Sequence, residues 1–393
     1  MKFELPKNVN YIISRLASCG YRADAVGGCV RDLLLGKSPS DYDLTTDATP
    51  EKIKEIFANE RTVDTGIKHG TVSIILDGEQ FEVTTYRVDG EYKDSRHPES
   101  VSFTRDIRDD LSRRDFTVNA MAYSSAFGLT DLFGGREDLE NEIIRAVGDP
   151  DLRFTEDALR ILRALRFSST LGFGIEQNTA RALREKKNLL TNVSAERIYV
   201  ELRKLIEGKN AYNVLSEYGD VISVVLPEIF PLALPEKSLF ERSDFICRLL
   251  SMLYLSGGSL DSLCQRLHTE SHLRQLGGRV LSAVDKYTGF DDVDLTHILA
   301  ELDVEGAETL LRLEILLGRL DPDALKRLDV LKSNAVYKLS QLEIDGGDLI
   351  SLGARGRRVG EILNLLLTAV IDGKMVNNKE KLLKMAEELV KMN

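Results

Sequence analysis

Hydrophobic and polar positions along the chain predict a mixed α/β first part followed by a long helical part. In the first part, RADAVGG is typical of a strand that enters a glycine turn, and VRDLLLG is typical of a helix that begins directly after it. The segment DYDLTTD predicts a short strand, and ATPEKIKEIFA predicts a helix with a Thr-Pro start. The segment TVSIILDGEQFEVTTYR predicts two strands joined by a tight turn at Asp77-Gly78.

From Asp151 onward the alternating pattern of strands largely disappears. Glycine-bounded segments with apolar residues at helical spacing follow, namely EDALRILRALRFSSTLG, AERIYVELRKLIEG, LLRLEILLG and VGEILNLLLTAVIDG. Glycine and proline positions predict boundaries near residues 140, 205 and 320. The sequence therefore predicts the α+β class, with a compact head followed by a helical extension.

The composition is that of a folded protein. Of the 393 residues, 43% are hydrophobic and 29% are charged. No apolar run approaches the roughly 18 residues of a membrane-spanning helix, and the amino terminus does not resemble a secretory signal. The four cysteines include no CxxC pair. We therefore expect a cytoplasmic protein with reduced thiols and no membrane partner.

The net charge of −11 does not exclude a nucleic-acid partner, because binding depends on local basic surface. Between Arg153 and Lys187 the chain carries eight basic and four acidic residues. A second basic segment consists of Arg355, Arg357 and Arg358. Either segment can contact phosphate groups or form ordinary solvated surface, and the charge pattern does not decide between them.

Two closely spaced aspartates are candidate metal ligands. Asp41 and Asp43 are two residues apart in a predicted strand, so both carboxylates are expected on one face. Adjacent carboxylates repel one another unless a cation lies between them, and Mg²⁺ prefers carboxylate oxygens and substrate phosphates. The same DxD pattern is also common at turns. Glu82, in the predicted strand pair, is either a third metal ligand or a solvent-exposed side chain.

A glycine turn precedes this acidic pair, since Gly27-Gly28-Cys29-Val30-Arg31-Asp32 lies between a predicted strand and a predicted helix. Backbone N–H groups in such a turn can approach a phosphate closely, and the Arg31 guanidinium suits phosphate oxygens. The residues match neither GxxxxGK[ST] nor GxGxxG, which excludes a P-loop and a Rossmann fingerprint. A glycine turn followed by DxD indicates nucleotidyl transfer, in which two metal ions activate the attacking hydroxyl and hold the departing pyrophosphate.

With these residues in place, the chain resembles the class II tRNA nucleotidyltransferases, the CCA-adding enzymes and their poly(A) polymerase relatives. GGCVRD followed by DYD resembles their motif A, and the segment Arg113–Ala120 (RRDFTVNA) resembles motif B. Motifs C, D and E are similar to Asp131–Gly135, Glu156–Arg163 and Ser194–Ile198. All five occur in the family order between residues 27 and 198, and this ordered set is specific where a single motif is not. The C-terminal half is similar only in its helical character.

The resemblance implies a polymerase-β-type nucleotidyltransferase head with a mixed sheet, followed by an all-helical neck, body and tail. It implies a catalytic head at 1–140, a nucleotide-selecting neck at 141–205, a body at 206–320 and a tRNA-binding tail at 321–393. Asp41 and Asp43 are expected to be catalytic and to hold Mg²⁺, with Glu82 as the possible third ligand. The expected nucleotide-binding residues are Gly28, Arg31, Arg114, Asp115, Asn119, Asp157, Arg160, Arg163 and Arg166.

Asp157 and Arg160 offer a physical explanation of base selection. They are three residues apart in a predicted helix and are therefore expected to share one face. A carboxylate accepts from the exocyclic amino group of cytosine or adenine, whereas uracil and guanine present a carbonyl there. An unpaired buried polar group costs about 1–3 kcal/mol, so the pair can select C and A over U and G. Arg163 and Arg166 suit a triphosphate or the acceptor strand, and salt bridges on a solvated helix face are the alternative.

The resemblance implies that the protein adds CCA, from CTP and ATP, to the 3′ end of tRNA. The polar segment from Arg87 to Arg105, with Gly90, Lys93, Arg96 and Pro98, resembles the loop that CCA-adding members retain and favours full CCA addition. The alternatives are a CC- or A-adding enzyme, a poly(A) polymerase, and a non-catalytic RNA-binding protein. The last has no need of paired carboxylates. The sequence leaves the oligomeric state open.

Overall fold

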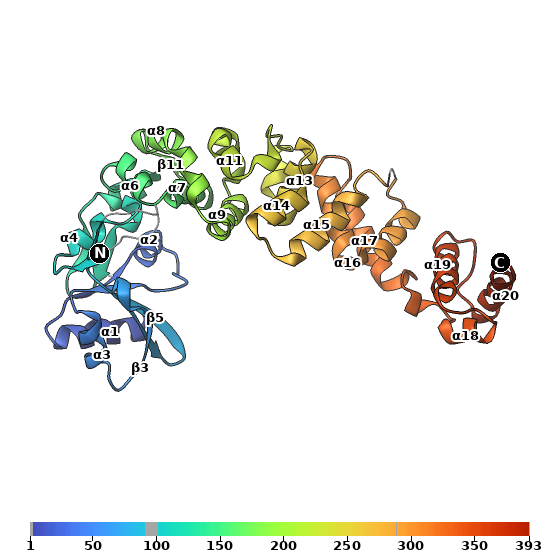
Figure 1. Cartoon of the computed structure of the whole chain (residues 1–393), viewed down its shortest axis with the longest axis horizontal. Helices are drawn as coiled ribbons and strands as arrows, with labels where there is room; N and C mark the ends of the chain where they lie inside the picture. The colour runs from blue at the N-terminus through green and yellow to red at the C-terminus, as the bar shows by residue number, and fades with distance from the viewer. Residues whose placement is uncertain (1–2, 91–100, 288, 393) are drawn as a thin grey trace. The chain divides into compact units, whose positions relative to one another are not determined.

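The computed structural model describes residues 3–90, 101–287 and 289–392, and the chain divides into two compact units, Met1–Pro227 and Glu228–Asn393. Among the described residues, every strand belongs to the first unit, and the second unit is helical (Figure 1). This confirms the predicted α+β class with a mixed-sheet head and a mostly helical remainder. The boundaries near residues 140, 205 and 320 stay predictions.

The first unit is built on a mixed seven-stranded sheet. Its strands are β1 (Ala23–Val26), β2 (Leu44–Thr46), β3 (Arg61–Gly66), β4 (Thr71–Leu76), β5 (Glu79–Thr85), β8 (Met121–Ser124) and β9 (Gly128–Asp131). The order is β3-β4-β5-β2-β1-β8-β9, in which β2 and β5 are parallel and the other neighbours are antiparallel. All residues of β1 and β2 are buried, as their central position requires.

The hairpin of β4 and β5 has the predicted turn. Asp77 and Gly78 have φ values of 52° and 84°, so both central residues are left-handed, as a two-residue type I′ turn requires. By contrast, β2 is shorter than predicted, because it begins at Leu44 and leaves Asp41 and Asp43 in the segment before it. Aspartate is depleted in strands, and neighbouring carboxylates repel one another. The prediction that Asp41 and Asp43 lie within the strand is therefore wrong, and the prediction that their carboxylates share one face stays a prediction.

Eleven α-helices are described in the first unit. They are α1 (Lys7–Ser18), α2 (Gly28–Leu34), α3 (Pro50–Ile56), α4 (Ile107–Ser112), α5 (Gly135–Glu140), α6 (Pro150–Glu156), α7 (Leu159–Leu171), α8 (Gln177–Glu185), α9 (Ala195–Glu207), α10 (Ala211–Glu217) and α11 (Gly219–Val225). As predicted, α2 follows β1 through the glycine turn, and α3 begins at Pro50 after Thr49. The helix predicted around motif D is interrupted at Asp157, which has φ −139° and ψ 102° and separates α6 from α7.

Two small sheets complete the first unit. The strands β10 (Ile143–Ile144) and β11 (Gly174–Ile175) are parallel, and β6 (Arg87–Asp89) and β7 (Val101–Phe103) form an antiparallel ribbon. This ribbon is the described part of the polar segment predicted between motifs A and B. Lys93, Arg96 and Pro98 of that segment lie outside the described residues.

The second unit is a helical array. Its helices are α12 (Lys237–Glu241), α13 (Phe245–Ser256), α14 (Leu260–Leu267), α15 (Ser271–Ala283), α16 (Asp292–Leu316), α17 (Asp323–Asn334), α18 (Gly346–Ser351), α19 (Arg357–Ile371) and α20 (Lys379–Lys391). A kink at Asp303 divides α16 into two helical segments. The last three helices share a hydrophobic cluster of their own, which includes Leu349, Leu366 and Leu382. In the part of the chain that the structure describes, no helix has the length and apolar character needed to span a membrane.

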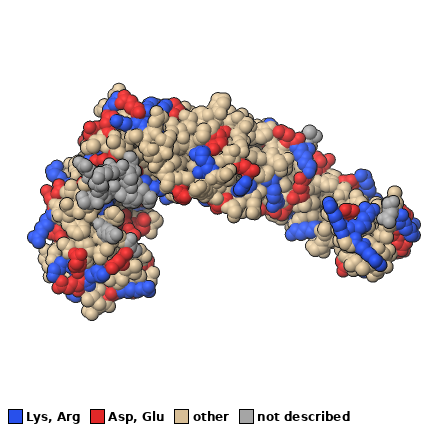
Figure 2. All heavy atoms as spheres, viewed as in Figure 1, with Lys and Arg blue, Asp and Glu red and all other residues tan. Residues whose placement is uncertain are grey.

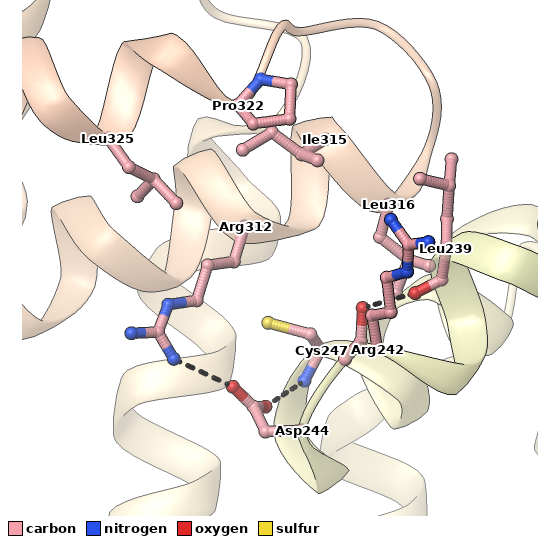
Figure 3. A pocket seen from close by; sticks show the side chains of 10 residues that line it. Leu239, Arg242, Asp244, Cys247, Arg312, Ile315, Leu316, Pro322 and Leu325 are labelled. Atoms are coloured by element: carbon pink, nitrogen blue, oxygen red, sulfur yellow. Dashed lines mark hydrogen bonds and ion pairs between the residues drawn. The ribbon is translucent and has the colours of Figure 1, made fainter.

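A cavity of about 470 Å³ lies among α12, α13, α16 and α17 of the second unit. Figure 3 shows the side chains of Arg312 and Asp244 pointing toward one another at its edge, where Nη1 and Oδ2 are 3.3 Å apart. Asp244 also caps α13 by accepting from the backbone N–H of Cys247 at 2.9 Å. The ion pair thus links the start of α13 to α16, and the cavity contains none of the predicted site residues.

Candidate active site

The glycine turn before α2 lies against the guanidinium of Arg114. Gly27 adopts φ 85° and ψ −132°, a conformation that residues with a side chain rarely adopt. A Cβ atom at Gly27 would lie 2.9 Å from Nη1 of Arg114, closer than real Cβ atoms approach. Gly28 begins α2, and a Cβ there would lie 3.6 Å from Nη2 of Arg31. The absence of a side chain at Gly27 therefore allows the turn and Arg114 to approach each other.

Asp41 and Asp43 lie exposed in the segment between α2 and β2. Although the Asp43 side chain reaches solvent, partial burial raises its pKa; the charge of Arg114 opposes this rise, and the charges of Asp41 and Glu82 add to it. Asp41 and Glu82 are therefore close enough to Asp43 for their charges to repel its carboxylate. Still, no group of three or more His, Cys, Asp or Glu side chains among the described residues is arranged to hold a metal ion. Glu82 is exposed, and its role as a third ligand stays a prediction.

Motif B connects α2 to α7 through a series of hydrogen bonds. Arg31 Nη1 donates to Asn119 Oδ1 at 2.8 Å, and Asn119 Nδ2 donates to Asp115 Oδ1 at 3.2 Å. The other oxygen of Asp115 lies 2.6 Å from Nη2 of Arg163 on α7. The structure thus brings four of the predicted nucleotide-binding residues into one contiguous network.

Asp115 is ionised within this network. Its burial favours the neutral carboxyl, but the charge and hydrogen bond of Arg163, with the hydrogen bond from Asn119, outweigh that effect and hold the pKa at about 2. The charge of Arg160 acts in the same direction. Asp115 is therefore an anion that fixes the positions of Arg163 and Asn119 at neutral pH.

Glu201, a buried acid on α9, contacts both Arg163 and Arg166. Arg166 Nε lies 2.5 Å from Glu201 Oε2, and Arg163 Nη1 lies 3.6 Å from Oε1. The Arg166 guanidinium also lies over the ring of Phe167, 3.8 Å from its centroid. Because Glu201 is 6% exposed, it needs these cationic partners, and it holds the two arginines one helical turn apart.

Ion pairs in the fold neutralise much of the positive charge of the basic stretch from Arg153 to Lys187. Each of its eight basic residues has an acidic side chain within 4.0 Å. Several of these partners come from other segments, among them Asp115, Glu201 and Asp220. Contact between this stretch and phosphate groups stays a prediction.

The prediction that Asp157 and Arg160 share one helical face is wrong, because the helix is interrupted at Asp157. The Asp157 carboxylate accepts from the backbone N–H of Leu159 at 3.1 Å, so it caps the start of α7. Its second oxygen accepts from Nη2 of Arg197 on α9 at 2.9 Å. A residue that caps a helix has non-helical backbone angles, and this is why the spacing rule fails here.

Arg160 is buried and joins motif D to motif B. Its Nη1 donates to Glu156 Oε2 at 2.7 Å and to the carbonyl oxygen of Arg153 at 3.2 Å. Its Nη2 donates to the carbonyl oxygen of Arg113 at 2.9 Å. Arg160 therefore lies beside the network of Asp115, and its predicted contact with a base stays a prediction.

Asp110 and Glu201 are two buried acids of the site that the sequence motifs did not identify. Asp110 precedes Arg113 and Arg114 by three and four residues, a spacing that is typical of ion pairs. Glu201 lies three residues after Ile198 on the apolar face of α9, and a buried acid on such a face requires a cationic partner. Both signals were present in the sequence. By contrast, no local pattern pairs Arg197 with Asp157.

Comparisons with known proteins agree with this geometry. A family model described as the poly A polymerase head domain matches residues 23–145. A second model, described as a probable RNA and SrmB-binding site of polymerase A, matches residues 172–231. The CCA-adding enzyme of Limosilactobacillus fermentum is 36% identical over an alignment that covers 97% of this chain and 96% of that protein. The CCA-adding enzyme of Enterococcus faecalis is 35% identical, with 96% and 94% covered.

Solved structures show the same relationship. The crystal structure of the Bacillus stearothermophilus CCA-adding enzyme in complex with CTP matches with a TM-score of 0.81 and 30% identity, covering 99% of this chain and 98% of that one. The Thermotoga maritima CCA-adding enzyme complexed with tRNA matches in fold, with a TM-score of 0.69 and 23% identity. The ordered motifs, the mixed-sheet head and these near full-length similarities together establish that the chain belongs to the family of CCA-adding enzymes, the tRNA nucleotidyltransferases that share their head domain with poly(A) polymerases.

Proposed function

We propose that this protein adds CCA, from CTP and ATP, to the 3′ end of tRNA in the cytoplasm. The observation that carries the proposal is the position of Arg114, whose guanidinium lies against the glycine turn and acts electrostatically on Asp43. Its Nε is buried and has no hydrogen-bond partner among the described residues. A buried guanidinium donor without a protein acceptor, next to an acidic pair, suits the phosphate groups of a nucleotide.

Asp41 and Asp43 are the residues that would hold Mg²⁺. Their carboxylates suit a hard divalent cation, and the mutual repulsion of the acids around Asp43 supports a cation there. When bound, the metal supplies activation of the 3′ hydroxyl and stabilisation of the departing pyrophosphate. The protein contributes a carboxylate pair in the segment that leads directly into β2. The pair is therefore anchored to the buried centre of the sheet.

The network around motif B provides the nucleotide pocket. Gly28 and Arg31 would contact the triphosphate at the start of α2, and Arg114, which lies against Gly27, would contact it as well. Asp115 and Asn119 would define the ribose pocket. Arg163 and Arg166, held by Asp115 and Glu201, would present positive charge to phosphates of the nucleotide or of the acceptor strand.

Asp157 and Arg160 would select the base. A carboxylate has about four lone-pair sites, so Asp157 retains acceptor capacity beyond its contacts with Leu159 and Arg197. It would accept from the amino group of cytosine or adenine. Arg160 would supply the donor side, for which its contact with Glu156 must be exchanged for one with the base.

The tail would bind tRNA through phosphate contacts. Figure 2 shows lysine and arginine side chains gathered over the C-terminal helices α19 and α20, with acidic side chains between them. Arg357 is 95% exposed, and Arg355 is also exposed. Arg358 is partly used within the tail, because its Nη2 donates to the carbonyl oxygen of Leu389 at 3.1 Å. Exposed guanidinium groups suit sequence-independent contacts with RNA phosphates.

The test is incubation of the purified protein with labelled CTP and ATP, Mg²⁺ and tRNA that lacks its CCA end. We expect three added nucleotides, and no addition by Asp43→Asn because the carboxylate charge is removed from the metal site. Asp64→Asn, which alters an exposed surface ion pair with Lys54, is the matched control and should retain full activity. Addition of C alone, of a single A or of a long A tract would each identify a different member of the family. Binding of tRNA without any addition would identify a non-catalytic RNA-binding protein and refute the proposal.

A further inference from the structure

Asp110 is a fully buried carboxylate between two arginines of motif B. It is 0% exposed and follows the ribbon of β6 and β7 in the chain. Its Oδ1 accepts from Nε and Nη2 of Arg113 at 3.0 and 2.7 Å. Its Oδ2 lies 3.5 Å from Nη2 of Arg114 and 3.1 Å from the hydroxyl of Thr45. Each oxygen therefore faces a different guanidinium.

Charged side chains alternate in sign from the ribbon to the acidic pair. Arg87 Nε donates to Asp89 Oδ1 at 3.0 Å, and the other oxygen of Asp89 lies 3.8 Å from Nη1 of Arg113. Asp110 follows Arg113 in this series, and Arg114 follows Asp110. Burial alone would raise the pKa of Asp110, but the charges of Arg113 and Arg114 lower it overall. Asp110 is therefore an anion.

The contacts of Arg114 show why this anion matters. Among the described residues, Asp110 is the carboxylate within ion-pair distance of Arg114, whose Nε has no partner. Holding the long side chain of Arg114 in one position costs conformational entropy, and the attraction of the Asp110 charge offsets that cost. Arg113 and Arg114 also repel each other when no anion lies between them. The position of Arg114 against the glycine turn thus depends on Asp110.

We propose that Asp110 is a positioning residue that holds Arg114 in place for the incoming nucleotide. The inference rests on the proposed function of Arg114 as a nucleotide contact. Asp110 does not itself touch the nucleotide, because it is buried and both of its oxygens are bonded to protein. It acts through Arg114, and its contact with the hydroxyl of Thr45 ties it to β2, which directly follows the segment of the acidic pair.

A double-mutant cycle tests this dependence. The full-length protein and the variants Asp110→Asn, Arg114→Ala and the double variant are compared in two assays, equilibrium binding of CTP and steady-state addition to tRNA lacking CCA. Asparagine keeps the shape of Asp110 and removes its charge. We expect the Kd and KM for CTP to rise about ten- to a hundredfold in Asp110→Asn, with the KM for tRNA unchanged. The double variant should be no worse than Arg114→Ala, because Asp110 acts through Arg114.

Asp138→Asn is the matched control, because Asp138 is also buried, paired with Arg145 and bonded to the Thr117 hydroxyl. It should lower the melting temperature and leave the KM for CTP unchanged. If Asp110→Asn does not fold, the combination of Asp110→Asn with Arg113→Gln removes both charges of the ion pair between these residues. This combined variant should show the same rise in Kd and KM for CTP.

Three results would overturn the proposal: an unchanged Kd for CTP, equal losses for CTP and tRNA, or losses that multiply in the double variant. The proposed function is tested separately by wild-type addition. Should the wild type bind CTP but add nothing to tRNA, the function fails while the binding cycle still decides the role of Asp110.

Discussion

Replacement of Gly27 by alanine tests the close approach between the glycine turn and Arg114. Two physical effects act together in this variant. Backbone angles of φ 85° and ψ −132° are sparsely populated by residues with a side chain, and such a residue costs about 1–3 kcal/mol of stability. In addition, the new Cβ would lie 2.9 Å from Nη1 of Arg114, whereas ordinary contact begins at 3.4 Å. Arg114 must therefore retreat by about 0.5 Å, which is 3.4 minus 2.9.

This retreat should lower catalysis as well as stability. A misplacement of about 1 Å at a reacting centre can cost about a hundredfold in rate, so half that distance corresponds to about tenfold. We expect kcat/KM for CTP to fall about tenfold in Gly27→Ala. Steady-state addition to tRNA lacking CCA measures the catalytic effect, and urea unfolding measures the stability.

Gly36→Ala is the control that separates backbone strain from the collision. Gly36 also has a positive φ, 68°, but a Cβ there has nothing within 4 Å. We expect it to lose about 1–2 kcal/mol of stability and to keep full activity. The reasoning is refuted if Gly27→Ala retains wild-type kcat/KM, or if Gly36→Ala loses as much activity as Gly27→Ala.

Two further variants test the site. The pKa of Asp115 is about 2 in the fold, whereas the ordinary value of an aspartate is 3.8, and this difference corresponds to about 2 kcal/mol of stability above pH 4 that is lost as the pH falls toward 2. The difference in unfolding free energy between wild type and Asp115→Asn should therefore narrow from pH 7 to pH 2.5 in urea titrations, and a difference independent of pH would contradict the ion pair. Asp157→Ala should raise incorporation of UTP and GTP relative to CTP and ATP, because it removes the acceptor that excludes a carbonyl. Equal losses of incorporation for all four nucleotides would show that Asp157 acts only as a helix cap.

The sequence by itself determined the local elements of the head and the family to which the chain belongs. The strand, glycine turn and helix from β1 to α2 follow from apolar runs and from the backbone freedom of glycine. The turn at Asp77-Gly78 and the Thr-Pro start of α3 likewise depend on residues next to each other in the chain. The order of the five motifs can also be read directly from the chain, and it sufficed to predict the mixed-sheet head and CCA addition.

For the pairs that join different elements, only the tertiary structure decided which acid holds which arginine. Arg163 meets Asp115 across 48 residues, and Arg197 meets Asp157 across 40. Spacing rules describe neighbours on one helix, so they account for the contact of Arg160 with Glu156, four residues earlier, but not for the contact of Arg197 with Asp157. A buried charge takes whichever opposite charge the packing of helices and strands brings within a few ångströms. That choice is a property of the folded chain, because the contacts of a side chain depend on elements far from it in sequence.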